Sequence, residues 1–387
     1  MDQSELIHML TCQKEKFSID PDITYLNGSY MSPLLKSAVQ AGIKAIQSKA
    51  KPWNITPADF FAEANELKHL FAKMINVADH NRIAIVPSVS YAISNAARNI
   101  RFEKGDRIVL IDKIFPSNYF IWKKLADQFE LELIMVNAPV DFTNRGAKWN
   151  DAILKAMTPK TKVVALENIH WADGTRFEIK AISERSKEIG AKIIVDGTQG
   201  IGAYPFDQEA MQVDVLVVAG YKWLLGPYSI GMAYYGDAYD QGEPIEENWI
   251  NKLRSENFET LTDYQSADKP LAAKYSMGEQ SQFVHAPMLK ESMRQLLEWG
   301  IDNVQEYCRS IVDEMLPALI EKNIWIEESN YRANHIFGLH PPYEITASLK
   351  EKILSNKVYV SYRSQVIRVS PNIYNTADDL RKLIDLL

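Results

Sequence analysis

The stretch that decides the fold runs from Ala191 to Gly231 and reads AKIIVDGTQGIGAYPFDQEAMQVDVLVVAGYKWLLGPYSIG. It contains two short apolar runs, Ala191–Val195 and Val213–Ala219, that are rich in β-branched residues and bounded by Gly and Asp. This pattern is typical of strands that are buried on both faces of a parallel sheet. The stretch therefore predicts two neighbouring strands of an open α/β sheet.

Polar residues follow each of these two predicted strands. Asp196 and Gln199 come just after the first strand, and Tyr221 and Lys222 come just after the second. In open α/β sheets, ligands bind outside the carboxyl ends of the strands. We therefore expect a carboxylate, an amide, a phenol and an amine to converge at one edge of the sheet.

These four groups have a chemical use in common. A lysine amine held beside apolar and aromatic residues can lose its proton and form a Schiff base with an aldehyde, and a carboxylate can keep a pyridine nitrogen protonated. Together they indicate a site for pyridoxal phosphate. The alternative is an ordinary surface lysine, but Lys222 lies between Tyr221 and Trp223 in the run GYKWLLGP, where the neighbours are apolar and aromatic.

Two strings within the stretch carry a family resemblance. DGTQ at 196–199 and AGYKWLLGP at 219–227 resemble the signature of the class V aminotransferases, a family of pyridoxal phosphate enzymes that includes cysteine desulfurases, kynureninases and isopenicillin N epimerase-like enzymes. The resemblance implies that Asp196 pairs with the pyridine nitrogen, that Gln199 contacts the phenolic oxygen, and that Lys222 carries the cofactor as an internal aldimine. Asp196 and Lys222 are therefore the first catalytic candidates.

The resemblance also implies a fold. It is the α/β fold-type I architecture of pyridoxal phosphate-dependent transferases, in which a large domain with a mostly parallel seven-stranded sheet is joined to a smaller α/β C-terminal domain. A chain of 387 residues favours two lobes on length alone. We expect a large domain over 20–265 and a small domain formed by 1–19 and 266–387.

The periodicity of the rest of the chain agrees with a doubly wound sheet, since strands alternate with helices over about 82–235. The opening residues, to about Phe17, are expected to form an amphipathic helix that carries Leu6, Ile7 and Leu10. The further predicted strands are 82–86, 107–112, 131–136 and 162–167, and the further predicted helices are 34–50, 57–74, 122–129, 150–157, 180–189, 287–299 and 304–321.

A turn rich in small hydroxyl residues follows the strand at 82–86. Ser88, Val89 and Ser90 lie where a helix begins, and a helix start offers free backbone N–H groups to an anion. Helix capping by a serine predicts the same local structure, but the family has its phosphate site here. The resemblance adds Tyr221 as a phosphate contact, whereas Ala219 stands where many relatives have a phosphate-binding serine.

Two further stretches match parts of the family's cofactor site. In KIFPSNYF, Phe115 resembles the kynureninase phenylalanine that stacks on the pyridine ring, with Asn118 in place of an aspartate; burial in the core is the alternative for Phe115. In NIHWADGT, His170 lies at the expected edge of the cofactor and could assist proton transfer. Simple hydrogen bonding at a strand end is the alternative for His170.

The substrate-binding candidates come from the two ends of the chain. The string RVSPNIYNT from Arg368 resembles a C-terminal motif of the family in which the arginine clamps the α-carboxylate of the substrate, a task that suits a planar guanidinium. A surface edge position is the structural alternative for this arginine. The segment YLNGS resembles one that enters the active-site cleft, so Asn27 and Gly28 are possible substrate contacts.

Composition limits the setting in which the protein acts. Apolar residues make up 46% and charged residues 24% of the chain, which is ordinary for a globular enzyme, and the formal charge of −7 argues against non-specific nucleic-acid binding. We identify neither a secretory signal, nor a membrane span, nor a set of metal ligands. Two cysteines, Cys12 and Cys308, form no disulfide framework, and we expect a cytoplasmic protein.

The resemblance implies a homodimer whose active site is completed across the interface. In relatives, a Gly-Thr-Pro loop reaches into the partner's site; here the sequence reads MGEQS, with Glu279 in place of the threonine. The irregular connection over 237–270 is long enough to carry function or an interface. No role follows for Glu279 from the sequence.

The expected substrate is a small-molecule amino acid, and the reaction is transamination, racemisation or β-elimination. A cysteine desulfurase or C–S lyase and a kynureninase-like hydrolase are alternatives, although 356–365 lacks the nucleophilic cysteine of desulfurases and Cys308 lies on a predicted helix. A binding protein without turnover is the alternative from another class. A nicotinamide-dependent oxidoreductase is disfavoured, because Gly200-Ile201-Gly202 lacks the third glycine of a dinucleotide fingerprint.

Overall fold

The structure is a computed structural model, and it describes residues 10–387. Most of the helix expected at the start of the chain, including Leu6 and Ile7, therefore lies outside the described residues. From Leu10 onward the first regular element is one short 3₁₀ turn, Lys14–Lys16.

A seven-stranded sheet forms the centre of the molecule, with the strand order β2-β8-β7-β6-β5-β3-β4. Neighbouring strands from β7 to β4 are parallel, and β8 is antiparallel to both β7 and β2. The predicted mostly parallel sheet is confirmed. Its strands are β2 Ile83–Val86, β3 Arg107–Ile111, β4 Glu132–Val136, β5 Thr161–Glu167, β6 Lys192–Asp196, β7 Val215–Ala219 and β8 Gly231–Tyr235.

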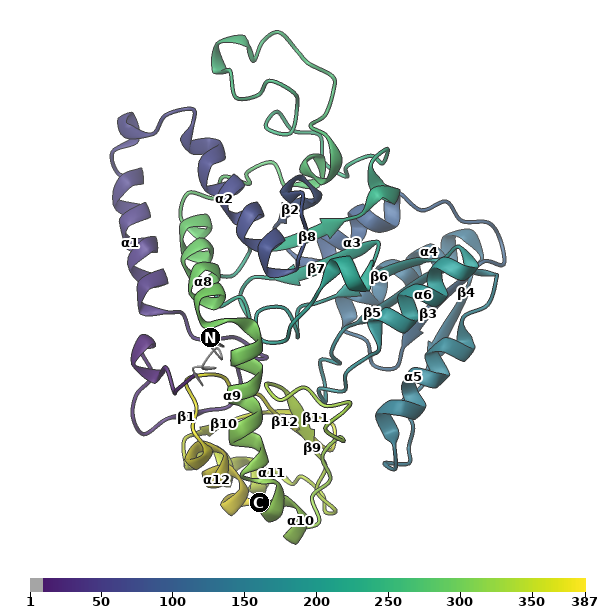
Figure 1. Ribbon diagram of the computed structural model, residues 1–387, viewed down its shortest axis with the longest axis vertical. Coiled ribbons are helices and arrows are strands. Elements are labelled where there is room, and N and C mark those ends of the chain that lie inside the picture. The colour runs from purple at the N-terminus through teal and green to yellow at the C-terminus, as the bar shows by residue number, and fades with distance from the viewer. Residues whose placement is uncertain (1–9) are drawn as a thin grey trace, which may run out of the picture.

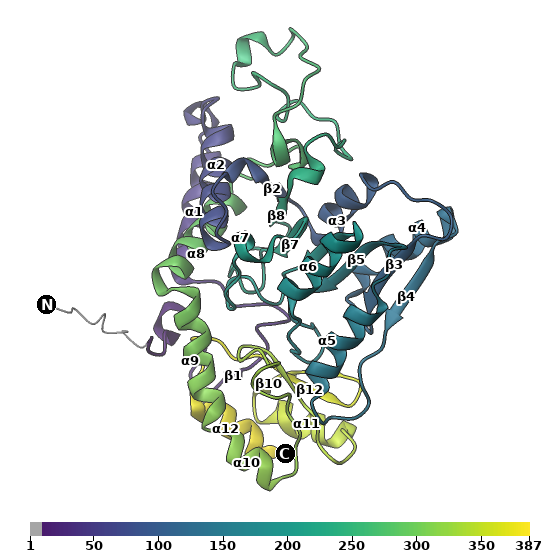
Figure 2. The same cartoon turned by 45° about the vertical axis from the view of Figure 1, so that its right-hand side comes forward.

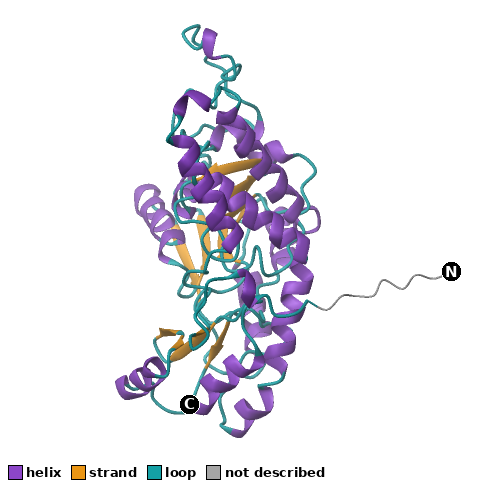
Figure 3. Cartoon of the chain, turned by 90° about the vertical axis from the view of Figure 1, so that its left-hand side faces the viewer, coloured by secondary structure: helices purple, strands orange, loops and turns teal. Residues whose placement is uncertain are grey.

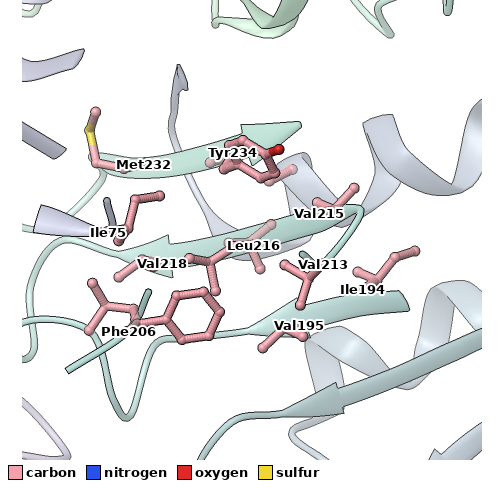
Figure 4. Packing of buried hydrophobic residues seen from close by; sticks show 14 of the residues in the cluster. Ile75, Ile194, Val195, Phe206, Val213, Val215, Leu216, Val218, Met232 and Tyr234 are labelled. Atoms are coloured by element: carbon pink, nitrogen blue, oxygen red, sulfur yellow. The ribbon is translucent and has the colours of Figure 1, made fainter. Parts of the chain in front are cut away.

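The inner strands are buried because their sequences offer no polar face. All five residues of β7, from Val215 to Ala219, are buried. Val195, Leu216 and Val218 pack against Phe206 and Ile75 in the large core (Figure 4). This burial holds the carboxyl ends of β6 and β7 in a fixed position, where the functional residues begin.

Helices pack on the sheet and beside its β2 end, and Figures 1 and 2 show α1, α2 and α8 grouped together there. The helices of this lobe are α1 Lys36–Lys49, α2 Asp59–Met74, α3 Val89–Arg98, α4 Phe120–Phe129, α5 Arg145–Ala156, α6 Ile179–Ile189, α7 Gln208–Met211 and α8 His285–Trp299. No helix within 10–387 has both the length and the apolar composition to cross a membrane.

A smaller lobe lies below the large sheet (Figure 3) and has its own hydrophobic cluster. It holds a three-stranded antiparallel sheet, β11-β12-β9, and a parallel pair, β1-β10. Strand β1 comes from near the start of the chain and β10 from near its end. The small lobe therefore combines segments from both ends of the chain. The strands are β1 Thr24–Tyr25, β9 Phe337–Leu339, β10 Val358–Tyr359, β11 Ser361–Arg363 and β12 Val366–Val369. The exact division into domains stays a prediction.

The helices of the small lobe differ from the prediction at one place. The single helix expected over 304–321 is two helices, α9 Ile301–Asp313 and α10 Leu316–Glu321. Pro317 is in the first turn of α10, where its missing N–H is tolerated, whereas within a continuous helix its ring would clash with the preceding turn. The remaining helices are α11 Ala347–Ser355 and α12 Ala377–Leu386.

A buried ionic cluster joins the two lobes. Arg145 of α5 donates to Asp173 at 2.7 Å and to Glu327 at 3.0 Å, and Thr175 donates to both carboxylates. The guanidinium also lies over Trp149, 5.0 Å from the ring centroid. Since Glu327 belongs to the connection between α10 and β9, this cluster holds the small lobe against α5.

Residues 247–265 form an irregular arm that projects from the end of the large lobe, drawn in green at the top of Figure 1. The predicted irregular character of this connection is confirmed. Trp249, Leu253, Leu261 and Tyr264 keep exposed apolar surface on the arm.

Candidate active site

A cavity of about 230 Å³ opens at the carboxyl ends of the parallel strands. Eight residues that the sequence nominated line it: Ser88, Val89, Ser90, Phe115, Asp196, Gln199, Tyr221 and Lys222. They come from the turns after β2, β3, β6 and β7, so strands far apart in the chain deliver them to one place. This convergence is what the doubly wound sheet predicts.

Lys222 lies in the tight turn after β7 and is only 7% exposed. Its Nζ lies 5.4 Å from the centroid of the Phe115 ring and 5.6 Å from that of Tyr221. Burial lowers the pKa of this amine to about 8, and the charge of Asp196 only partly opposes the shift. A much larger fraction of Lys222 is therefore neutral, and nucleophilic, near neutral pH than of an exposed lysine.

Asp196 is the last residue of β6 and is buried. Its Oδ1 accepts a hydrogen bond from the backbone N–H of Thr198 at 3.0 Å, and the hydroxyl of Thr198 accepts one from the N–H of Ala219 at 3.1 Å. Thr198 thus ties the ends of β6 and β7 together. Burial raises the pKa of Asp196, so a cation bound beside this carboxylate would stabilise its charged form.

Gln199 is oriented by three neighbours. Its Nε2 donates to the carbonyl of Ser29 at 3.2 Å, its Oε1 accepts from the indole N–H of Trp223 at 2.9 Å, and its backbone carbonyl lies 2.6 Å from Nε2 of His335. With one amide hydrogen directed to Ser29, the second is left for a group in the cavity. The side chain is held firmly enough to act as a fixed donor.

The start of α3, where the sequence predicts a phosphate site, lies at the wall of the cavity. Ser88 is the N-cap, and its hydroxyl accepts a hydrogen bond from the N–H of Tyr91 at 3.2 Å. The N–H groups of Val89 and Ser90, which precede that contact, have no partner within the helix and lie at the cavity wall. The hydroxyls of Ser88 and Ser90 are 3.0 Å apart.

Aromatic rings close the sides of the cavity. Tyr221 packs against Tyr228, with ring centroids 4.6 Å apart. Burial raises the pKa of Tyr221 to about 12, so its phenol stays protonated and can donate a hydrogen bond to an anion. Tyr228 and the adjoining Ser229 also line the cavity; the sequence analysis did not single them out, although a PYS turn directly before β8 was a usable signal.

Glu167 and Trp171 are two further lining residues that the sequence analysis missed. The Glu167 carboxylate accepts the backbone N–H groups of Phe115 at 2.8 Å and of Trp171 at 3.0 Å, so it positions two walls of the cavity. Burial raises its pKa to about 7. A charged residue directly after the apolar run 163–166 of β5 was the available signal.

His170, predicted to act in proton transfer, does not line this cavity. Its Nδ1 lies 2.9 Å from Asp173 and its Nε2 lies 3.2 Å from the carbonyl of Asp112, in a neighbouring cavity. Because the turn after β5 sends Glu167 and Trp171 toward Lys222, His170 between them is directed to the other side. Asp173 raises the pKa of His170 against the opposing effect of burial.

Asn118 is likewise absent from the lining residues. Its side chain is fully buried, and its Oδ1 accepts from the indole N–H of Trp122 at 3.0 Å. The residue lies in the 3₁₀ turn Pro116–Asn118 that leads into α4. Its side chain therefore packs under that helix, and the structure does not bring it to the cavity with Phe115.

The three predicted substrate contacts lie behind Trp171, at the boundary with the small lobe. Arg368 is 1% exposed; its Nη1 donates to the carbonyl of Trp171 at 2.8 Å and its Nη2 to the hydroxyl of Ser361 at 2.9 Å. Ser361 donates in turn to the side-chain oxygen of Asn27 at 2.6 Å. The structure thus joins Arg368 and Asn27 through one hydroxyl.

Gly28 is next to this chain of hydrogen bonds, where its backbone N–H donates to the carbonyl of Ser370 at 3.3 Å. A side chain at this position would lie 3.0 Å from the hydroxyl of Tyr374 and 3.5 Å from the ring of Trp223. The glycine is thus explained by close packing of the segment YLNGS against both lobes.

This set of donors fits pyridoxal phosphate. Free N–H groups and protonated hydroxyls at the start of α3 suit a phosphate, and a buried carboxylate that lacks a strong cationic partner suits a ring nitrogen that carries a proton. Across the cavity, Lys222 supplies a buried amine with a lowered pKa. The three groups come from separate strand ends and reach one volume.

Comparison with known proteins agrees with this arrangement. The family model described as "Aminotransferase class-V" matches residues 54–324. The chain is 24% identical over 318 residues, 81% of its length, to the uncharacterized aminotransferase YcbU of Bacillus subtilis (strain 168), of which 80% is covered. It is also 24% identical over 234 residues to the isopenicillin N epimerase of Streptomyces clavuligerus, covering 60% of this chain and 58% of that protein.

Among solved structures, the cysteine desulfurase CsdA of Escherichia coli is similar, with a TM-score of 0.80, 15% identity and 96% of both chains covered. At this identity the likeness speaks for the fold, and it confirms the predicted fold-type I architecture. The predicted family resemblance is confirmed by the family model.

Proposed function

Because the chain belongs to the aminotransferase class-V family, which uses pyridoxal phosphate, we propose that it is a pyridoxal phosphate enzyme that acts on an amino acid through Lys222. The observation that supports this most is the buried Lys222 amine, with its lowered pKa, in one cavity with Asp196. A lysine with a purely structural role would not need a buried amine whose lowered pKa makes it nucleophilic.

The other lining residues receive roles from their geometry. Bound pyridoxal phosphate would supply an aldehyde for amines and a ring that withdraws electrons from the carbon beside the substrate nitrogen. Val89 and Ser90 would hold the phosphate through their N–H groups, with Ser88, Ser90 and Tyr221 donating from their hydroxyls. Phe115 would cover the ring and exclude water, while Gln199 would donate its free amide hydrogen.

Two residues would control protons. The carboxylate of Asp196 would keep the ring nitrogen protonated, because it lies in a buried site where a positive partner is favoured. The Lys222 amine would remove or return the proton on the α-carbon of the substrate. Arg368 would orient the substrate by binding its α-carboxylate through two parallel hydrogen bonds.

The proposed reaction is transamination, racemisation or β-elimination. A desulfurase that uses a mobile cysteine is disfavoured, since 356–365 contains no cysteine and Cys308 is fully buried. Burial also raises the pKa of the Cys308 thiol, which disfavours the reactive thiolate.

We also propose a homodimer. On α1, Val39, Ile43 and Ile46 leave apolar side chains exposed at helical spacing, and Trp53 is exposed just beyond the helix. An exposed apolar stripe of this kind is typical of an interface. Light scattering on the purified protein should give twice the mass of one chain, which is 44.1 kDa; a single-chain mass at micromolar concentration would contradict the dimer.

The test of the enzyme proposal is a near-visible absorbance spectrum before and after borohydride, with peptide mapping of the reduced protein. We expect a yellow band that borohydride bleaches and a cofactor adduct on Lys222. Lys222→Ala should lose both the adduct and turnover, whereas Lys180→Ala, which changes an exposed lysine of α6, should keep both. A colourless protein that pyridoxal phosphate cannot reconstitute would favour a binding protein instead.

A further inference from the structure

A second arginine lies beside Arg368. Strand β11 pairs with β12 in antiparallel register, with Ser361 opposite Arg368 and Arg363 opposite Val366. Paired residues and alternate residues of a hairpin share one face, so both arginines are on the same face. That face meets Trp171, since the guanidinium carbons of Arg363 and Arg368 lie 4.9 Å and 5.8 Å from centroids of its ring system.

Neither arginine has a carboxylate partner in the part of the chain that the structure describes. Arg363 is partly buried, donates from Nη1 to the carbonyl of Tyr362 at 2.7 Å, and has a buried Nε that lacks a partner among residues 10–387. The buried Nε of Arg368 lacks one too. Burial lowers the pKa of both groups, to about 9 for Arg368, and no acidic group opposes the shift.

Two cations removed from water without counter-charges are costly, and an anionic ligand would offset that cost. The arginines also act on the reactive amine: after burial and the opposing charge of Asp196, the charge of Arg368 and then that of Arg363 contribute to the pKa of Lys222. Both guanidinium groups also lie against Trp171, which lines the cavity that contains Lys222.

Arg363 further lines a second cavity of about 260 Å³. Trp171 is the wall between this cavity and the one that contains Lys222, because it lines both. The charged and titratable residues around the second cavity are Asp112, Lys113, Arg145, His170, Asp173, His340 and Arg363. Of the two acidic ones, Asp173 is already bound by Arg145 and His170.

We propose that the substrate is an amino acid whose side chain carries a second anionic group, with Arg368 binding the α-carboxylate and Arg363 binding the side-chain anion. Arg363 is two residues along β11 from Ser361, the partner of Arg368, which separates the two positions by about 7 Å along the strand. That separation suits two anionic groups of one molecule. This inference rests on the proposed function of the same site.

The first test compares charged amino acids with their neutral isosteres: aspartate with asparagine, and glutamate with glutamine, each as both enantiomers. The wild-type enzyme should prefer the acidic member in kcat/KM. Arg363→Leu should lower kcat/KM for the acidic member by roughly 10- to 100-fold, as expected for loss of a hydrogen bond between charged groups, and should leave the neutral member within about twofold. Arg363→Lys should restore part of the preference.

The second test needs no reaction. Glutarate and butyrate carry two and one carboxylates and no amine, so calorimetry can measure their binding directly, both to the enzyme as purified and after addition of pyridoxal phosphate. Wild type should bind glutarate roughly tenfold more tightly or better, and Arg363→Leu should bind the two alike. Arg185→Leu, which removes an exposed arginine of α6 paired with Glu188, should behave as wild type.

Three outcomes separate the possibilities. If Arg363→Leu weakens acidic and neutral substrates equally, both arginines serve one carboxylate or Arg363 only packs on Trp171, and the proposal is overturned. A wild-type preference for neutral amino acids overturns it as well. If the yellow adduct on Lys222 never forms while glutarate still binds selectively, the proposed enzyme function fails and the two-anion site stands.

Discussion

At Lys222, burial away from water determines the reactivity of the amine. The residue follows a buried strand and is covered by aromatic rings, so its amine pays for desolvation without a close ionic partner. The sequence analysis found this residue, together with Asp196, because each directly follows an apolar run. His170 was expected at the edge of the same site, but Glu167 and Trp171 face the cavity in its place. The direction of a side chain in a turn depends on contacts that no local pattern encodes.

The lowered pKa of Lys222 predicts how the cofactor-free protein captures pyridoxal phosphate. Only the neutral amine attacks the aldehyde, so the capture rate should rise as the pH increases through about 8 and level off above it. An ordinary lysine would show the same rise near pH ~10.4. Stopped-flow absorbance from pH 6.5 to 10 measures this profile; a rise that continues to about pH 10 would contradict it.

Glu167 predicts a pH-dependent stability. Its pKa is about 7 in the folded protein against an ordinary 4.5, so between these values the folded state binds more protons and stability falls as the pH rises. Above pH ~7 the buried charge costs on the order of 3 kcal/mol. Glu167→Gln should remove this loss, in exchange for one weakened backbone contact.

Urea unfolding of the cofactor-free protein at pH 5 and pH 8 tests the Glu167 prediction. The wild type should lose more stability between the two values than Glu167→Gln does. An equal loss in both proteins would mean that the carboxylate is already charged at pH 5.

Among the elements, six strands of the large sheet were predictable, because a parallel sheet is built from continuous apolar runs; the antiparallel strand β8 and the short strands of the small lobe were not named. Contacts between residues that are far apart in the sequence were less predictable. The pair Gly200 and Gly202 resembles half of a nucleotide motif, yet Gly202 has φ +105° and a side chain there would lie 2.2 Å from the carbonyl of Trp223. Gly202 serves close packing of this turn against the Lys222 loop, and Gly200 serves close packing against Asn168; sequence spacing reveals neither contact.

Two serines at the start of α3 allow helix capping and cofactor binding to be tested separately. Ser88→Ala removes the cap bond to Tyr91 and should cost about 1 kcal/mol of stability, and it should also weaken cofactor binding. Ser90→Ala leaves the cap bond intact and should affect cofactor binding alone. Thermal unfolding without cofactor, followed by titration with pyridoxal phosphate, measures both; equal stability of the two variants would argue against the cap.

In the whole molecule, the Arg145 cluster is a buried ionic contact that joins the two lobes. Arg145→Met would leave Asp173 and Glu327 buried without their partner and should cost about 3–5 kcal/mol. Arg107→Met, which removes a more exposed pair with Glu132, should cost about 0–1 kcal/mol. Urea unfolding compares the two; similar losses would show that the cluster is solvated. No local sequence pattern predicts this cluster, because its members are separated by up to 182 positions.

The path of the chain has a consequence for synthesis. Asn27 and its hydrogen-bond partner Ser361 are 334 positions apart in the chain. Strand β1 likewise can form its strand pair only after β10 has been synthesised. At a ribosome speed of about 5–20 residues per second, the opening segment emerges some 15–70 seconds before its partners exist. The large sheet can assemble in that interval, but the substrate end of the site cannot. A nascent chain that stops short of β12 should therefore be able to form the strand ends around Lys222 while lacking Arg368, the group that would hold a substrate there.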